Sequence, residues 1–318
     1  MRMLGLTLAL TSGVALASVA LAAETFPKSA DIKVRNLTEA SFPRWQQLVP
    51  NVYAYEDTHS PDPSGGVINT VSLIVVTNDG VVLVDGQGDS MYGQRLVDSI
   101  KKLTPQPLKY VVVGSDHIDH VGGNPELKAA WPAAVWISSP ASKATMERNK
   151  NAVLPTELVS DKRAMTVGGT EIQILNLGRA HTGGDLAVYL PATKVLFLGE
   201  IYLRDVFPAM RSAYPTEWIE TIKKAEALNA DWVIPGHGFV DSKAELKADL
   251  AESRKALEAV IAEVKRVHAT GAKCESPQNC EAAKQANFGP YKDWALSGSQ
   301  IPLAVAKVYQ EIEGKLPK

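Results

Sequence analysis

Four of the six histidines in this 318-residue chain lie in three short glycine-rich loops, each of which follows a predicted strand. The loops span residues 114–124, 178–185 and 235–238. A strand end fixes the backbone before each loop, and glycine allows neighbouring loops to approach closely. Imidazole and carboxylate groups that converge from several loops are the ligands that zinc or iron prefers. The pattern therefore predicts a divalent metal site.

The first loop carries the strongest part of this signal, because Asp116-His117-Ile118-Asp119-His120 places two acids and two imidazoles within five residues. A single Gly-His-Gly, as around His237, is a weak signal alone, and it gains meaning from the other two loops. His59 and His268 lie outside these loops, in a proline-rich segment and a polar helical segment. We expect both of them to be surface residues.

Composition and charge narrow the class of protein. Lys and Arg total 33 and Asp and Glu total 35, so the formal net charge is −2, which argues against nucleic-acid binding through a global basic field. Hydrophobic residues make up 45% of the chain, enough for a sizeable core. Only Cys274 and Cys280 are available for a disulfide, which we expect in an oxidising compartment; a metal-binding pair is the alternative.

The N-terminus resembles an export signal. Arg2 precedes an apolar stretch over residues 4–21, and Ala20-Leu21-Ala22 offers small residues at the positions that a signal peptidase reads. We predict a cleaved signal peptide at residues 1–22 and a periplasmic or secreted mature chain without stable membrane insertion. An uncleaved membrane anchor is the alternative.

Alternating strands and helices must position the three loops. The patterns predict one domain over residues 23–318. Strands are expected at 51–56, 70–77, 81–85, 110–113, 171–176, 186–190, 195–198 and 232–234, and helices at 90–103, 216–228, 242–270 and 301–315.

These loops resemble the motifs of the metallo-β-lactamase superfamily over about residues 48–241. The family motif His-x-His-x-Asp-His, followed by Gly-Gly, is matched by residues 115–120 and 122–123, with Ser115 in place of the first histidine. The later family histidines match His181 and His237, the bridging acid falls on Glu200, and the acid that supports the metal loop falls on Asp85.

The resemblance implies an α/β fold, a four-layer αββα sandwich with extra C-terminal helices over residues 242–318. It also implies two metal positions. Asp119, His120 and His237 form a complete set of three ligands with an open position, as in catalytic zinc sites. His117 and His181 form a second, weaker set with Ser115, Asp116 or Glu200. Because a serine hydroxyl is a poor zinc ligand, we expect one firmly bound Zn²⁺ and a second that is weaker or absent.

The activity that this resemblance implies is hydrolysis of a small-molecule ester, lactone, β-lactam or related bond by metal-activated water. Asp116 or Asp119 is the expected proton acceptor. Three alternatives remain open: a hydrolytic dehalogenase of chlorinated aromatics, a mononuclear iron sulfur-dioxygenase, and a zinc-binding accessory protein without turnover. Tyr202, Arg204 and Arg211 follow Glu200 and either face the substrate or lie on the surface. No sequence feature indicates an oligomeric state.

Overall fold

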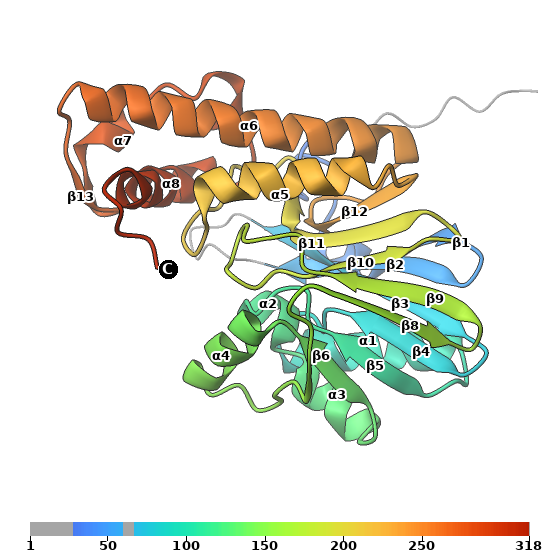
Figure 1. Cartoon of the computed structure of the whole chain (residues 1–318). Coiled ribbons are helices and arrows are strands. Elements are labelled where there is room, and N and C mark those ends of the chain that lie inside the picture. The colour runs from blue at the N-terminus through green and yellow to red at the C-terminus, as the bar shows by residue number, and fades with distance from the viewer. Residues whose placement is uncertain (1–27, 60–66, 318) are drawn as a thin grey trace, which may run out of the picture.

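The structure is a computed structural model that describes residues 28–59 and 67–317. The predicted signal peptide at 1–22 lies outside the described residues. Two sheets stack face to face, and helices cover the outer face of each (Figure 1). This arrangement confirms the predicted αββα sandwich.

The first sheet has seven strands in sequence order, antiparallel from β1 to β4 and parallel from β4 to β7. Its strands are β1 (Arg44–Val49), β2 (Val52–His59), β3 (Ile68–Thr77), β4 (Gly80–Val84), β5 (Leu108–Val112), β6 (Val135–Ser138) and β7 (Glu157–Leu158).

The second sheet has five strands in the order β12-β11-β10-β9-β8, and only the β11–β12 pair is parallel. Its strands are β8 (Lys162–Val167), β9 (Thr170–Leu175), β10 (Ala187–Leu190), β11 (Val195–Leu203) and β12 (Trp232–His237). Every residue of β11 and β12 is buried, because sheets and helices cover both of their faces.

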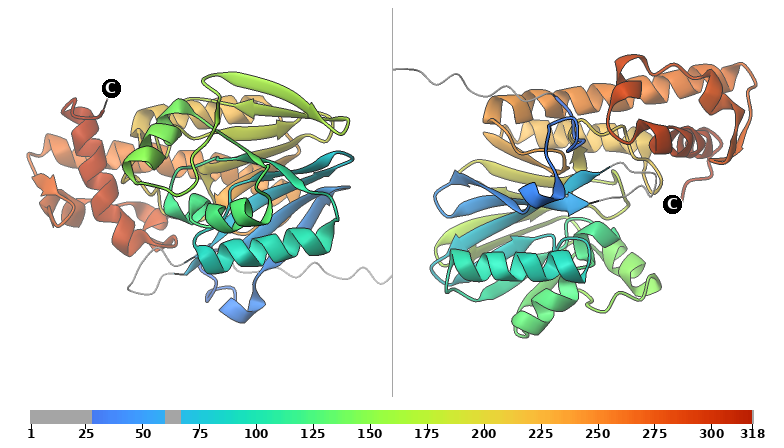
Figure 2. Two further views of the ribbon diagram at one scale, coloured as in Figure 1. Left: turned by 90° about the horizontal axis from the view of Figure 1, so that it is seen from below. Right: turned by 180° about the vertical axis from the view of Figure 1, so that it is seen from behind.

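Four helices lie against the seven-stranded sheet, and α5 and α6 lie against the five-stranded sheet (Figures 1 and 2). The first group is α1 (Ser90–Leu103), α2 (Ile118–Val121), α3 (Asn124–Ala130) and α4 (Pro140–Arg148). The second group is α5 (Pro215–Ala227) and α6 (Lys243–Ala269). Apolar side chains from both sheets and from α5 and α6 form the largest core cluster. This core holds the loop-bearing strand ends in place.

The C-terminal part extends beyond the sandwich. Ser242 caps α6 by accepting from the backbone N–H of Glu245, and the Glu245 side chain accepts from the N–H of Ser242 in return. After α6, the strands β13 (Cys274–Ser276) and β14 (Asn279–Cys280) form a hairpin closed by the Cys274–Cys280 disulfide. Then come α7 (Glu281–Gln285) and α8 (Ser297–Ile312), which packs on α6.

The predicted strands and helices are confirmed with shifts at their ends. The last predicted helix begins at Ser297, four residues earlier than expected. The long helix predicted over 242–270 is partly buried, because one face of α6 carries buried residues such as Leu250, Leu257 and Val264. In the described ranges, no helix combines the length and apolar character needed to cross a membrane.

Candidate metal centre

The loop after β5 is held by Asp85, at the end of β4. The Asp85 carboxylate accepts from the backbone N–H of Gly114 at 2.6 Å and contacts Nδ1 of His120 at 2.8 Å. A second link joins the same loops, since the backbone N–H of Gly86 donates to the carbonyl of His120 at 2.7 Å. Nε2 of His120 therefore points away from Asp85 and into the site. This position of Asp85 agrees with the supporting role that the resemblance implied.

His237 is oriented in the same way by Asn69 of β3. Nδ1 of His237 donates to the backbone carbonyl of Asn69 at 2.7 Å. The Asn69 side chain in turn pairs with the backbone of Gly238, accepting from its N–H at 2.8 Å and donating to its carbonyl at 3.1 Å. Because a carbonyl oxygen can only accept, Nδ1 carries the proton, and Nε2 of the neutral imidazole presents a lone pair.

Glu200 reaches the same place from β11. Adjacent to it, Gly236 of β12 lies so close to β11 that a Cβ atom there would be 2.6 Å from the backbone carbon of Gly199. Only a residue without a side chain permits this approach. The parallel pairing of β11 and β12 therefore brings Glu200 and His237 to one edge of the sheet.

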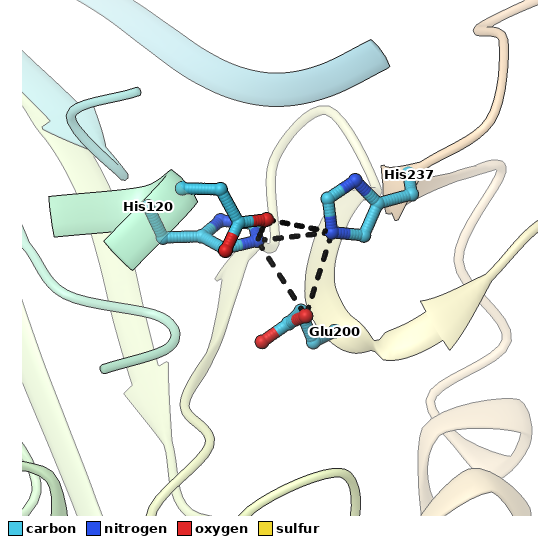
Figure 3. Close-up of side chains that lie close together, drawn as sticks. His120, Glu200 and His237 are labelled. Atoms are coloured by element: carbon cyan, nitrogen blue, oxygen red, sulfur yellow. Dashed lines mark hydrogen bonds and ion pairs between the residues drawn. The ribbon is translucent and has the colours of Figure 1, made fainter. Parts of the chain in front are cut away.

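Asp119, His120, Glu200 and His237 form the first cluster, and all four are buried. Figure 3 shows the side chains of His120, Glu200 and His237 pointing toward one another. Nε2 of His237 lies 3.0 Å from Oδ2 of Asp119, 3.4 Å from Oε1 of Glu200 and 3.4 Å from Nε2 of His120. Nε2 of His120 lies 3.4 Å from Oδ2 of Asp119. Four donor atoms thus surround one point.

His117, His181 and Glu200 form the second cluster. Nε2 of His181 lies 3.0 Å from Oε1 of Glu200, and Nδ1 of His117 lies 3.0 Å from Oε2. The two ring nitrogens are 3.2 Å apart. Ser115 also points here, because its hydroxyl donates to Oε2 of Glu200. Glu200 therefore contacts members of both clusters.

The first cluster needs positive charge at its centre. Two imidazole Nε2 atoms and two carboxylates converge there, and their mutual repulsion is relieved only by protons or by a cation. Burial lowers the pKa of His237, but its hydrogen bonds to Asp119 and Glu200 outweigh burial and raise the pKa to about 10. In the second cluster, burial likewise lowers the pKa of His117, but the interaction with Glu200 outweighs burial and raises the pKa to about 9. The nitrogen and oxygen donors suit a divalent transition metal, which would replace those protons.

The loop that carries His181 is fixed from two sides. The Asp185 carboxylate accepts from the backbone N–H and the hydroxyl of Thr182, at 2.7 and 2.6 Å. Burial raises the pKa of Asp185 to about 6, against the lowering effect of His181. On the other side the indole of Trp218 meets the ring of His181 edge-on, with centroids 5.3 Å apart. Trp218 is buried and donates its indole N–H to the carbonyl of Ile201, so it packs in the core.

Asp116 is separated from the other predicted ligands. It belongs to neither cluster formed by the described residues, and its side chain lies beside Ser142 of α4, where it lines a second hollow. Asp119, by contrast, lies within 3.0–3.4 Å of two ring nitrogens. Of the two predicted proton acceptors, the structure brings only Asp119 into the metal cluster.

The surface position expected for His59 is wrong. Its Nε2 lies 3.7 Å from Oδ2 of Asp119, and its ring stacks on His237 with centroids 6.0 Å apart. Burial lowers the pKa of His59. The strand predicted to end at residue 56 continues as β2 to residue 59 and delivers the His59 side chain to the site.

The clusters open into a cavity of about 320 Å³. Arg211 lines it, but the other two candidate substrate contacts do not. The hydroxyl of buried Tyr202 donates to the carbonyl of Leu246, and buried Arg204 pairs with Asp249 at 2.8 Å. Tyr202 and Arg204 therefore have structural roles. Apolar residues complete much of the cavity wall: Ile68, Ile118, Leu203, Val206, Ala209, Leu296 and Leu303.

Comparison with known proteins identifies the family that this geometry belongs to. The family model for the metallo-beta-lactamase superfamily matches residues 65–237. A metallo-beta-lactamase type 2 from Bacillus sp. (strain 170) is 25% identical over 203 residues, which cover 62% of this chain and 77% of the relative. The 2,4-dinitroanisole O-demethylase subunit alpha of Nocardioides sp. (strain JS1661) is 23% identical over 209 residues, covering 62% of this chain and 63% of that protein.

The fold is also shared with solved structures. A metallo-beta-lactamase from Pontibacter korlensis superposes with a TM-score of 0.60 at 22% identity, covering 67% of this chain and 99% of the other. Since nearly all of that protein is matched, about a third of the present chain has no counterpart in it.

Proposed function

This chain belongs to the metallo-beta-lactamase superfamily and is a metal-dependent hydrolase, and from that premise we propose that it is an exported zinc enzyme that cleaves a small ester, lactone, β-lactam or related bond with metal-activated water. The observation that carries the proposal is the convergence of imidazole nitrogens and carboxylates. Asp85 fixes the far side of the His120 ring, and Asn69 fixes the far side of the His237 ring.

Asp119, His120, His237 and Glu200 would hold the firmly bound zinc, and His117, His181 and Glu200 the weaker one, with Ser115 at the position of the missing histidine. Zinc in such a site acidifies bound water to a pKa of roughly 7 and polarises the bond under attack. Asp85 and Asn69 keep the ring planes and tautomers of His120 and His237 fixed, as partners of metal-binding histidines commonly do. Asp119 is placed to accept a proton, while the apolar cavity wall limits the access of bulk water.

Metal analysis and activity assays test this proposal together. Purified mature protein is expected to bind at least one equivalent of zinc, and His120→Ala and His237→Ala are each expected to lose both zinc and turnover. His268→Ala is the matched control, because His268 packs on Tyr309 and lines neither metal cluster. The assay panel comprises nitrocefin, lactones and aryl esters. Zinc retained at wild-type stoichiometry in His237→Ala would refute the assignment of the ligands.

Halogenated and methoxylated aromatics belong in the same panel. They test the alternative of hydrolytic substitution on an aromatic ring. The specific observation in favour of this alternative is a relative whose name describes demethylation of an aromatic ether. The metal separates the remaining alternatives: bound iron with oxygen consumption would indicate a sulfur-dioxygenase, and bound zinc without turnover on the whole panel would indicate an accessory protein.

Export is a separate part of the proposal. The Ala-x-Ala sequence at 20–22 and the Cys274–Cys280 disulfide both support an oxidising location, periplasmic or extracellular. N-terminal sequencing of protein recovered from an expression host is expected to begin at Ala23. An N-terminus that retains Met1 or Arg2 on membrane-bound material would contradict it.

A further inference from the structure

A second hollow adjoins the metal cavity. It has a volume of about 730 Å³ and shares His117, Ile118 and Arg211 with the metal cavity. Ile118 is 66% exposed between the two, although it is a large apolar side chain. A molecule bound across Ile118 would therefore extend from the metal ligands into the second hollow.

The second hollow is lined by three cations that the described structure leaves without a carboxylate partner. They are Arg148 of α4, Arg211 after β11, and Lys307 of α8. In residues 28–59 and 67–317, none of the three forms an ion pair within 4.0 Å; Arg148 donates to the Thr145 hydroxyl at 2.9 Å and interacts electrostatically with Asp116 from a greater distance. Asp116 is the one acid among the described lining residues, so the lining carries a net positive charge.

Lys307 is the most informative of these cations. It lies half-buried on α8, and burial lowers its pKa, with no acid to compensate. An unpaired ammonium group that is partly buried destabilises the ligand-free protein, because burial removes part of its hydration. A bound anion that pairs with this group offsets that cost. Arg254, another partly buried cation, has a partner within the chain, because it lies 3.1 Å from Glu226.

One face of α8 contributes to both cavities. Gln300 and Leu303 line the metal cavity, and Lys307, one turn further along, lines the second hollow. Leu303 stands opposite apolar residues of the sandwich, including Leu203 and Val206, in the metal cavity. Helix α8 lies outside the stretch matched by the family model, so this wall is an addition to the family core.

We propose that the substrate of this site is amphiphilic: an apolar part contacts Leu203, Val206 and Leu303, the reacting bond lies beside His117 and His181, and an anionic group, carboxylate or phosphate, binds Arg148, Arg211 and Lys307. This inference rests on the proposed hydrolase function. Charge-assisted hydrogen bonds to the three cations would fix the orientation of the anion, and α8 would define the substrate class.

Binding and turnover are measured separately on the mature, zinc-loaded protein. The binding probes are 4-phenylbutyrate, 4-phenylbutyl phosphate and the neutral 4-phenylbutanamide, followed by calorimetry. At least one anion is expected to bind about tenfold or more tightly than the amide. The double variant Arg148→Gln/Lys307→Gln is expected to remove most of that preference while leaving the affinity for the amide and the zinc content unchanged. Lys265→Gln, an exposed change on α6, is the matched control.

Turnover is compared on 4-nitrophenyl hexanoate and the 4-nitrophenyl monoester of adipic acid, which differ by a terminal carboxylate. If the anions bind no better than the amide, or if the double variant keeps the preference, the anion site is wrong even when both esters are hydrolysed. If the anion preference is lost in the double variant but no ester is cleaved, the anion site stands and the hydrolase function is in question. The two anionic probes separate a carboxylate site from a phosphate site.

Discussion

Ser115 stands where the family motif has its first histidine, and its environment shows what a histidine there would do. The Ser115 side chain is fully buried, and its hydroxyl donates to the same Glu200 oxygen that contacts Nδ1 of His117. It therefore occupies a corner of the second cluster and contributes a neutral oxygen instead of an imidazole.

Ser115→His is expected to raise the occupancy of the second metal position. An added imidazole should increase zinc affinity there by about tenfold or more, since removal of even a supporting residue typically costs 10–100-fold. The measurement is zinc stoichiometry at limiting metal in competition with a chelator. Ser115→Ala serves as the control, because it removes the hydroxyl without adding a ligand. Unchanged occupancy in a folded Ser115→His protein would contradict the account of the weaker site.

The sequence was sufficient to predict which loops converge, but not which side chains of those loops face one another. The structure places His120 and His237 in one cluster and His117 and His181 in a second, and Glu200 belongs to both. Asp116 and Asp119 were both expected as proton acceptors, but Asp119 lies within the short helix α2 and faces the cluster, whereas Asp116 precedes α2 and lies beside α4. Such directions depend on backbone angles over three residues, which residue types do not fix.

At the scale of elements, buried Glu56 of β2 connects the sheet to the metal loop. Its carboxylate accepts from Nδ2 of Asn69 at 2.7 Å, and Asn69 holds both His237 and Gly238. Burial raises the pKa of Glu56 to about 7, against the lowering effect of Arg44. Between the ordinary value of 4.5 and about 7, the folded chain binds more protons at Glu56 than the unfolded chain does.

The sign follows from that difference in bound protons. The free energy of unfolding contributed by Glu56 falls as pH rises through this window, by at most about 3 kcal/mol. Glu56→Gln cannot ionise and still offers an oxygen to Asn69, so its stability relative to wild type is expected to increase between about pH 5 and pH 8. Urea unfolding of both proteins at the same zinc concentration measures this. A constant difference across the range would mean that Glu56 is ionised throughout.

Close contact between two elements makes Gly122 irreplaceable. Residue 122 follows α2, and a Cβ atom there would lie 1.4 Å from the carbonyl oxygen of Gly88. Gly122→Ala therefore forces α2 away from the 86–88 loop and breaks the contact between Gly86 and His120. We expect a loss of roughly 3 kcal/mol in unfolding free energy and weaker zinc binding.

The matched substitution is Gly298→Ala in α8, where a Cβ atom meets nothing within 4 Å. That change is expected to be neutral or to stabilise the protein by up to about 1 kcal/mol, because alanine restricts the unfolded chain. Thermal or urea unfolding, with a zinc titration in parallel, compares the stability and the zinc affinity of Gly122→Ala and Gly298→Ala. Equal stability of both variants would show that the α2 contact is not tightly packed.

The C-terminal helices show where prediction from sequence stops. Periodicity was enough to predict α6 and α8, because apolar residues recur at helical spacing. That α8 lines the metal cavity was not predictable, since the cavity brings together residues more than 100 positions apart, such as Leu303 and Glu200, which both line it. For the same reason the sequence did not decide whether Arg204 faces the substrate or lies on the surface. Its partners Asp241 and Asp249 follow 37 and 45 positions later.

At the scale of the whole molecule, ion pairs that involve buried charges attach α6 and the segment from residue 28 to the sandwich. Arg204 links β11 to α6 through Asp249, and Lys28 reaches the same Asp249 at 2.5 Å. Arg35 pairs with Asp241 at 2.9 Å, just before α6 begins. These pairs give α6 a fixed position relative to the sheets, and α6 supports α8 in turn. The cavity wall thus depends on the extension as a folded unit.

The Cys274–Cys280 disulfide stabilises that extension at a distance from the metal. Its hairpin packs on α8, yet neither cysteine lines the metal cavity. Closing a loop of this length restricts the unfolded chain, and in the chain-entropy description this raises the free energy of unfolding by about 2 kcal/mol. The double variant Cys274→Ser/Cys280→Ser is therefore expected to lower the Tm by roughly 4 °C.

Zinc content and turnover are expected to stay at wild-type values in this variant, because the hairpin contributes no side chain to either metal cluster in the described residues. A reductant should lower the Tm of the wild type to that of the variant and leave the variant unaffected, which separates loss of the bond from loss of two side chains. If reduction instead releases zinc, the hairpin must set the position of α8 over the cavity, and the disulfide would then couple the redox state of the compartment to the metal site.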